Sequence, residues 1–288
     1  SILVSVALDH QDFLGETLAE IARDKAGILR SGKTAVLGQM PREAFLEVER
    51  VARHRSARLL DARRARLEPR GGGRADLTTP NGQRYRLAPG LLGEHQMRNA
   101  RLAILAAEQL RSLFPSIDGA ACERGIATAR LPCRLEWLEL PRAGKRSRGV
   151  LLDGAHNPDA VRCLESYLAG LGEPCDLLFG AFRDKDAGSM LEILRPRVER
   201  IWLTSWEHPR AWRRGDAASG ALSRGWEWVS SPQEGLRRAA AAGPARPLVV
   251  AGSLSLVSRV RERIVSPDPP EEILSAPVSR SRTQSEPR

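Results

Sequence analysis

The sequence is poor in three features that would each define a class of protein. It has no apolar run near the ~18 residues needed to cross a bilayer, so no membrane span is expected. Its four cysteines (Cys122, Cys133, Cys163 and Cys175) include no CxxC spacing, which argues against a zinc site or a disulfide framework. Residues 1–8 lack the basic region and cleavage site of a signal peptide, so they are predicted to form a strand. A cytoplasmic location is expected.

Aromatic residues are also scarce, at 5%, while lysine and arginine number 45 against 35 acidic residues. The resulting net charge of +10 could suit a polyanion. However, the arginines are spread over the chain, with no interleaved aromatic side chains and no recognition motif. We therefore expect a solvated basic surface that suits small anionic substrates and binds no nucleic acid.

The length of 288 residues and the order of apolar patterns predict an α/β protein with two lobes. Apolar strand patterns alternate with amphipathic helix patterns in residues 1–131, with hairpin signals at 71–73 and 81–82 before a long helix pattern at 91–113. A second strand–helix series covers residues 132–265. Residues 266–288 are rich in proline, serine and charge, which is typical of a disordered tail.

Lys25 is the unusual member of the first helix pattern. Thr17 and Glu20 have the spacing of a capping box, so the helix register can be counted from there. That register places Lys25 on the same face as Ile21 and Leu29. An ammonium group on an apolar face either extends to solvent or meets an anion or a metal site. Both interpretations are open from the residues alone.

Asp9 and His10 directly follow the first predicted strand. The carboxyl ends of strands in open α/β sheets are where ligands bind, although a single histidine in this place is more often structural.

The stretch VLLDGAHNPDAV predicts a buried strand, a short loop and a helix. Asn157 is suited to cap that helix and Pro158 to occupy its first position. A strand that leads into a helix N-terminus forms an anion-binding corner, into which Asp153 and His156 are expected to project.

Two segments together resemble a known family. LDHQDFLGETLAEIARDKAGI and VLLDGAHNPDAV are similar to the folylpolyglutamate and dihydrofolate synthases of the Mur ligase superfamily, and weaker similarities follow in the same order along residues 94–263. The resemblance implies that residues 1–131 are the remainder of a P-loop-type ATP-binding central domain. It implies a Rossmann-like C-terminal domain over residues 132–265.

The resemblance also implies roles for single residues. His10 would ligate magnesium, and Lys25 would be a carbamylated lysine that helps to hold a metal. Asn99, in a segment similar to HQxxNAxxA, would contact adenine from the first turn of its helix. Arg134 would reach the ATP phosphates, with Cys133 in place of the family's usual glycine. Asp153 would bind the ribose or adenine side, and His156 would lie near the phosphates with a catalytic role.

The reaction implied is the ATP-dependent addition of L-glutamate to dihydropteroate or a reduced folate through an acyl phosphate, by a monomer that uses Mg²⁺. The family's GTNGKGS-like P-loop is expected to be absent, so we expect this chain by itself to be inactive. One alternative is a Mur-type cell-wall ligase, which the DGAHNP and KAGI segments argue against. The other is a catalytically inactive fragment that retains ligand binding.

Overall fold

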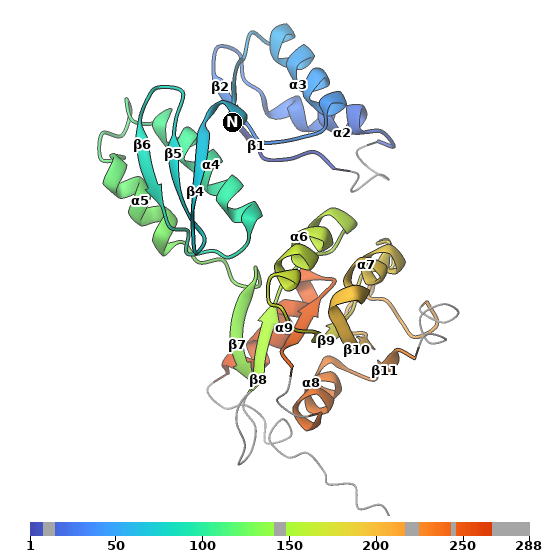
Figure 1. Ribbon diagram of the computed structural model, residues 1–288. Coiled ribbons are helices and arrows are strands. Elements are labelled where there is room, and N and C mark those ends of the chain that lie inside the picture. The colour runs from blue at the N-terminus through green and yellow to red at the C-terminus, as the bar shows by residue number, and fades with distance from the viewer. Residues whose placement is uncertain (8–14, 141–147, 217–224, 243–245, 267–288) are drawn as a thin grey trace, which may run out of the picture. The chain divides into compact units, whose positions relative to one another are not determined.

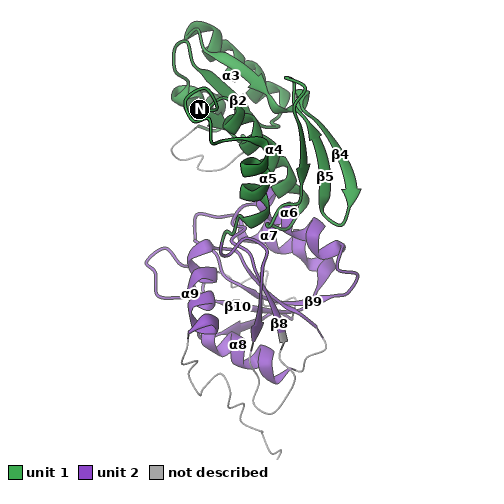
Figure 2. Cartoon of the chain, turned by 90° about the vertical axis from the view of Figure 1, so that its left-hand side faces the viewer, with its two compact units in different colours: residues 1–131 green, residues 132–288 purple. Residues whose placement is uncertain are grey.

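The structure, a computed structural model, describes residues 1–7, 15–140, 148–216, 225–242 and 246–266. It divides into two compact units, Ser1–Leu131 and Pro132–Arg288 (Figures 1 and 2). Within the described ranges, no helix is long and apolar enough to cross a membrane. Each unit has its own sheets and helices.

Unit 1 begins with a parallel sheet of three strands, in the order β1-β2-β3. The strands are β1 (Ile2–Leu3), β2 (Thr34–Leu37) and β3 (Arg58–Asp61). Alternate side chains of β2 point to opposite faces: Ala35 and Leu37 pack in the core of α2 (Leu18–Lys25) and α3 (Arg42–His54), whereas Val36 packs in a second core. The predicted strand over residues 1–8 is therefore much shorter in the structure.

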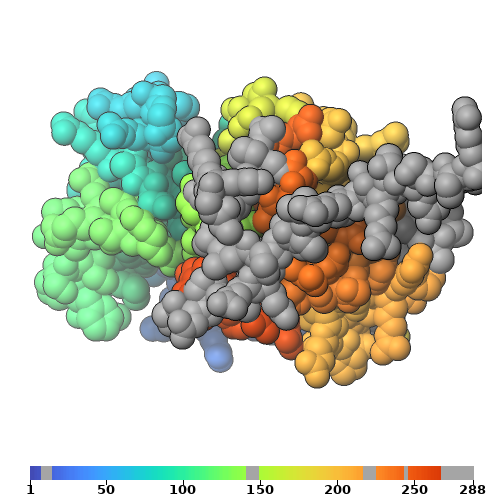
Figure 3. Space-filling view, turned by 90° about the horizontal axis from the view of Figure 1, so that it is seen from below, coloured from blue at the N-terminus to red at the C-terminus, as the bar shows by residue number. Residues whose placement is uncertain are grey.

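The second core of unit 1 joins an antiparallel sheet to two helices. The sheet has the order β4-β5-β6, from β4 (Arg66–Gly71), β5 (Arg74–Thr78) and β6 (Arg84–Leu87). Its buried side chains pack on α4 (Glu94–Glu108) and α5 (Gly119–Thr128). The stretch after α4 keeps large apolar side chains at the surface, with Leu113 71% and Phe114 55% exposed. The space-filling view of Figure 3 colours unit 1 from blue to green.

Unit 2 is a six-stranded sheet covered on both faces by helices. The strand order is β11-β10-β9-β12-β8-β7, and only the edge strand β7 runs antiparallel to its neighbour. The strands are β7 (Glu136–Leu140), β8 (Arg148–Leu152), β9 (Cys175–Phe179), β10 (Val198–Thr204), β11 (Glu227–Val229) and β12 (Leu248–Ala251).

The helices of unit 2 follow from the alternation of apolar side chains along these strands. Leu151 and Val249 point to the face covered by α6 (Pro158–Ala169) and α7 (Ala187–Leu194). Their neighbours along β8 and β12 point to the face of α8 (Pro232–Ala241) and α9 (Leu254–Val265). Strands buried on both faces are typical of a doubly covered parallel sheet, which confirms the predicted α/β class.

Three short 3₁₀ helices complete the described elements: η1 (Ala26–Ile28), η2 (Ala62–Arg64) and η3 (Arg195–Arg197). The first of them directly continues α2.

Candidate functional site

Three loops of unit 2 follow the carboxyl ends of adjacent strands. They begin at Asp153 after β8, at Gly180 after β9 and at Gly252 after β12. Backbone hydrogen bonds join them, since Gly252 N donates to Ala155 O at 3.0 Å and Gly180 N donates to Ala251 O at 3.3 Å. The carboxyl edge of a parallel sheet is where such folds bind ligands, so this corner is the candidate site.

Asp153 is 6% exposed and organises the first loop. Its Oδ1 accepts from Ala155 N and its Oδ2 from Leu135 N, both at 2.9 Å. The carboxylate thereby ties the loop after β8 to the turn before β7. This role is structural, and the direct contact with a nucleotide that the family resemblance implies stays a prediction.

His156 and Asn157 directly precede the N-terminus of α6. Asn157 Oδ1 accepts from Ala160 N at 2.9 Å and Pro158 begins the helix, which confirms the capping prediction. His156 is half-buried, with Nδ1 2.9 Å from Gly154 O. Because a carbonyl can only accept, this contact places a proton on Nδ1. The helix dipole and amide groups at this end favour an anion.

Arg134 lies beside the loop after β8, and no acidic side chain pairs with its charge among the described residues. Among the described residues, its half-buried guanidinium has no hydrogen-bond or ion-pair partner. A β-carbon built on Gly154 would lie 3.1 Å from Arg134 Nη1, so the guanidinium packs against the loop. Cys133 has φ +62°, the left-handed backbone that its glycine in the family pattern would adopt at low cost. The exchange of glycine for cysteine leaves the turn intact but strained.

Ser253 adds a buried hydroxyl to the same corner. It is 1% exposed and is the N-cap of α9, yet its Oγ makes no hydrogen bond within the described structure. The next residue, Leu254, packs against Gly154. A buried polar atom without a partner is uncommon, and a bound ligand or water would supply the missing hydrogen bond. Sequence alone showed only that Ser253 lies in a family-like segment.

The loops after β9 and β10 are joined by Arg210. Its Nη2 donates to both carboxylate oxygens of Asp184 at 2.9 and 3.1 Å, and its guanidinium lies 4.7 Å from the centre of the Phe182 ring. Asp186 caps α7 by accepting from Ser189 N. The side chain of Lys185, between these two aspartates, is 9% exposed. The segments at 179–191 and 208–211, which both resemble the family, are therefore in contact.

Lys25, predicted on a buried helix face, is half-buried at the last position of α2. The capping box from Thr17 to Glu20 is confirmed. The ammonium of Lys25 has no hydrogen-bond or ion-pair partner among the described residues. Asp9 and His10 lie outside the described residues, so their geometry relative to Lys25 stays a prediction.

No group of three His, Cys, Asp or Glu side chains that could hold a metal ion occurs within the described ranges. Because the expected ligand His10 lies outside them, a metal held at Lys25 stays a prediction.

Asn99 is exposed and lies one turn further along its helix than expected. Helix α4 begins at Glu94, so Asn99 is in the second turn rather than the first. Its Nδ2 donates to Oε1 of Gln96 at 3.1 Å, and Gln96 is 7% exposed. The contact fixes the orientation of the amide, while its contact with adenine stays a prediction.

The expectation that the chain has no P-loop pattern is wrong as a statement about spacing. Residues 27–34, GILRSGKT, match GxxxxGK[ST]. The structure gives these residues another role, because Gly27 and Ile28 belong to η1 and β2 begins at Thr34. A phosphate loop runs from a strand into a helix N-terminus, whereas this one runs from a helix into a strand. The match therefore lacks the phosphate-binding geometry.

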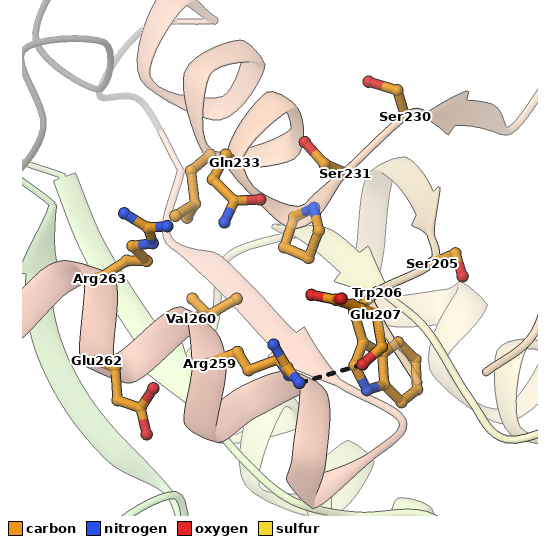
Figure 4. Close-up of a pocket in the computed structure, with 12 residues that line it drawn as sticks. Ser205, Trp206, Glu207, Ser230, Ser231, Gln233, Arg259, Val260, Glu262 and Arg263 are labelled. Carbon is orange, nitrogen blue, oxygen red and sulfur yellow. Dashed lines mark hydrogen bonds between the residues drawn. The ribbon is translucent and has the colours of Figure 1, made fainter. Parts of the chain in front are cut away.

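A separate cavity of about 540 Å³ lies between the loop after β10, the start of α8 and the side of α9 (Figure 4). Trp206, Ser231 and Arg259 contribute to its lining, and Arg259 Nη2 donates to Glu207 O at 3.1 Å. None of the predicted site residues that the structure describes lines this cavity. It is therefore not assigned to the candidate site.

Comparison with known proteins decides the family of the second unit. Residues 134–254 match the family described as Mur ligase, glutamate ligase domain. This segment of unit 2 is thus similar to a Mur ligase glutamate ligase domain. The matched segment holds Arg134, the Asp153 loop and Ser253, so the candidate site lies inside this domain.

The whole chain resembles folate enzymes. It is 30% identical over 275 residues to the folylpolyglutamate synthase of Lacticaseibacillus casei, covering 92% of this chain and 62% of that protein. The structure of E. coli FolC in complex with DHPP and ADP superposes with a TM-score of 0.73, at 27% identity, covering 91% and 60% of the two chains. The Yersinia pestis folylpolyglutamate synthase/dihydrofolate synthase, complexed with AMPPNP and Mn ion, gives a TM-score of 0.74 at 27% identity, covering 90% and 60%. The family resemblance seen in the sequence is confirmed, and the chain spans about three fifths of these proteins.

Proposed function

We propose that this chain is part of an ATP-dependent ligase that adds L-glutamate to dihydropteroate or a tetrahydrofolate, the activity implied by its resemblance to folylpolyglutamate and dihydrofolate synthases. The observation that carries the proposal is the uncompensated guanidinium of Arg134 against Gly154, beside the N-terminus of α6. A cation and a helix N-terminus that converge on one loop bind phosphate groups.

Each residue of the corner has a defined part in this proposal. Arg134 binds the nucleotide phosphates, while Asp153 holds the loop that presents them and faces the ribose or adenine side. His156 lies near the phosphates, where Nε2 is the ring nitrogen that does not contact Gly154 O. The buried hydroxyl of Ser253 offers one further hydrogen bond to a polar substrate group.

In unit 1, Asn99 is proposed to contact adenine, and Lys25, as a carbamate, to hold a divalent metal together with His10. A half-buried ammonium without a partner is consistent with such a modification. Magnesium, when bound, would neutralise phosphate charge. The manganese ion in the Yersinia pestis complex supports a divalent metal, and magnesium is the form we propose.

The chemistry requires a phosphoryl group of ATP to pass to a carboxylate of the folate or pteroate. The acyl phosphate then reacts with the amine of glutamate and releases phosphate. Positioned cations and backbone amides supply most of the stabilisation in phosphoryl transfer. Arg134 and the first turn of α6 fill that role in this chain. A monomeric state and a cytoplasmic location stay predictions.

The test measures ATP binding first and ligation second. We expect Arg134→Ala to weaken ATP binding by roughly 10- to 100-fold, since it removes a charge-assisted contact, and His156→Ala to act in the same direction. Transfer of labelled glutamate to dihydropteroate or tetrahydrofolate then identifies the acceptor. If both variants bind ATP as the unsubstituted chain does, the nucleotide site lies elsewhere and the proposal is wrong. Binding of ATP without ligation would agree with the expectation that this chain by itself is inactive.

A further inference from the structure

The turn that presents Arg134 has an unusual backbone. Cys133 has φ +62° and Leu135 has φ +46°, so two residues with side chains adopt the left-handed conformation on either side of the arginine. Such a backbone persists only where surrounding contacts hold it. Because Arg134 has no hydrogen-bond or ion-pair partner among the described residues, its direction depends on the turn and on its packing at Gly154.

Two carboxylates hold this turn from opposite ends. Asp153 accepts from Leu135 N at one end. Glu136 Oε2 accepts from Cys133 N at 2.8 Å, which fixes the other end. Gly154 N also donates to Cys133 O at 2.8 Å. Each of these three hydrogen bonds therefore involves the backbone of Cys133 or Leu135, the two left-handed residues.

Glu136 is in turn anchored to α9. Arg261 Nε lies 3.0 Å from Glu136 Oε1 and 2.9 Å from Oε2, and Cys133 Sγ lies 3.8 Å from Ser258 Oγ on the same helix. The side chains of Glu136 and Arg261 are 20% and 31% exposed, so water screens the pair only in part. The helix that begins after Ser253 therefore also supports the turn at Arg134.

We propose that Glu136 and Arg261 are positioning residues, which hold the left-handed turn so that Arg134 meets the nucleotide with its guanidinium already in place. This inference rests on the proposed nucleotide contact of Arg134. Pre-organisation of this kind lowers the cost of ordering a flexible side chain when the ligand binds. Neither Glu136 nor Arg261 needs to touch the nucleotide.

The decisive experiment is a double-mutant cycle on ATP affinity with Arg134→Ala and Glu136→Ala. We expect Glu136→Ala to weaken ATP binding roughly tenfold by itself and to have almost no further effect when Arg134 is already alanine, because it acts through that residue. Glu136→Gln keeps an acceptor for Cys133 N and should recover part of the affinity. Glu165→Gln, which alters the 2.6 Å pair with Arg197 in the same unit, is the matched control and should bind ATP normally.

A second measurement does not depend on the nucleotide. Cys133 is 2% exposed and Cys175 is fully buried, so alkylation of each thiol, resolved by peptide mass spectrometry, reports local opening. Arg261→Met and Glu136→Gln should each speed labelling of Cys133 by roughly tenfold, with Cys175 unchanged. These two variants keep the measurement informative if the alanine variant does not fold.

Two results would overturn the inference: additive losses of ATP affinity in the cycle, or labelling of Cys133 that is unchanged in both variants. If instead Arg134→Ala leaves ATP affinity unaltered, the proposed function of Arg134 fails, and the labelling of Cys133 still decides whether Glu136 and Arg261 hold the turn.

Discussion

Position 154 has only a hydrogen atom where any other residue would place a β-carbon. That carbon would lie 2.8 Å from Leu254 Cδ1 and 3.1 Å from Arg134 Nη1, and both of these are ends of flexible side chains. A larger residue would therefore displace them rather than break the fold. The absence of a side chain at Gly154 lets the arginine, the loop and the start of α9 meet.

We expect Gly154→Ala to move the guanidinium of Arg134 and to weaken ATP binding roughly tenfold, at a stability cost below about 1.5 kcal/mol because the neighbours can yield. Calorimetric titration and thermal unfolding measure the two effects. Gly188→Ala, on α7 with only Asp186 Oδ1 near its β-carbon, is the control for adding a methyl group. Unchanged ATP affinity in Gly154→Ala would show that the packing of Arg134 at Gly154 has no part in binding.

The residues that sequence reasoning placed well are those whose signal is local. Asn157 and Pro158 lie within one turn of the helix they start, and the capping box of Thr17 is equally short-range. The ion pair that supports the turn at Arg134 could not be predicted from a local pattern, because Glu136 and Arg261 are 125 positions apart in the sequence. Pairing over that distance depends on the completed sheet. The unpartnered hydroxyl of Ser253 likewise becomes visible only once its surroundings are known.

At the scale of elements, helix α3 ends in a motif that its sequence does not suit. Ser56 has φ +51°, with Ser56 N bonded to Arg53 O and Ala57 N to Ala52 O. This is the hydrogen-bond pattern of a Schellman C-cap, in which glycine is the usual left-handed residue. Ser56 is exposed, so its side chain contributes no packing.

Ser56→Gly should therefore raise the free energy of unfolding by about 0.5–1 kcal/mol. Glycine adopts the left-handed conformation without strain, and its greater conformational entropy in the unfolded chain offsets part of this gain. Chemical denaturation measures the change. Ser31→Gly, in the loop between η1 and β2, is not expected to stabilise, because Ser31 is not among the residues with a positive φ. A destabilised Ser56→Gly chain would contradict this account of the cap.

Helices α2 and α3 are joined by a charge cluster that makes stability depend on pH. Hydrogen bonds from Arg50 and then from Arg23 lower the pKa of Glu47 to about 2. A carboxyl group whose pKa is lower in the folded state stabilises the fold above its unfolded pKa of ~4.3 and loses that contribution as the pH falls toward 2.

We expect the stability difference between the unsubstituted chain and Glu47→Gln to shrink steadily between about pH 5 and pH 2. Urea unfolding at several pH values follows it. Glu43, exposed on the same helix with no ion-pair partner among the described residues, gives the control Glu43→Gln. If the difference is constant over this pH range, the ionisation of Glu47 does not affect the free energy of unfolding.

Helices and strands were predicted well where the apolar pattern is long. They were predicted poorly where the pairing of strands in the folded sheet determines the structure. The strands β8, β9 and β12 were all expected, whereas β3, β11 and helix α5 were not. β3 carries arginine and aspartate at its ends, and α5 is rich in alanine and glycine, so neither has a strong apolar pattern. The helix predicted over 91–113 spans Glu94–Glu108. Within the described part of residues 1–8, the expected strand is limited to Ile2–Leu3, which pair with Val36 and Leu37 of β2.

At the scale of the whole molecule, each hydrophobic core lies inside one unit. Two cores use only residues of unit 1, and two use only residues from Cys133 onward. A unit with its own complete core is expected to fold independently.

Residues 132–266 produced alone should therefore unfold in one cooperative transition, with a midpoint within a few degrees of one transition of the full chain. Scanning calorimetry tests this. A shorter piece, residues 132–180, lacks β10 and β12 and should not fold, because β12 pairs with both β8 and β9. Failure of residues 132–266 to fold would show that stability is shared between the units.

The central place of β12 also imposes an order on synthesis. β8 leaves the ribosome about 100 residues before the strand that fills the space between it and β9, and Arg261 emerges later still. A parallel sheet whose middle strand is translated after its neighbours cannot close while they are being made, so its apolar edges stay open to chaperones until β12 emerges. A nascent chain that stops before β12 thus exposes these edges, and one that stops before α9 still lacks Arg261, so an oriented Arg134 is expected only once that helix has been made.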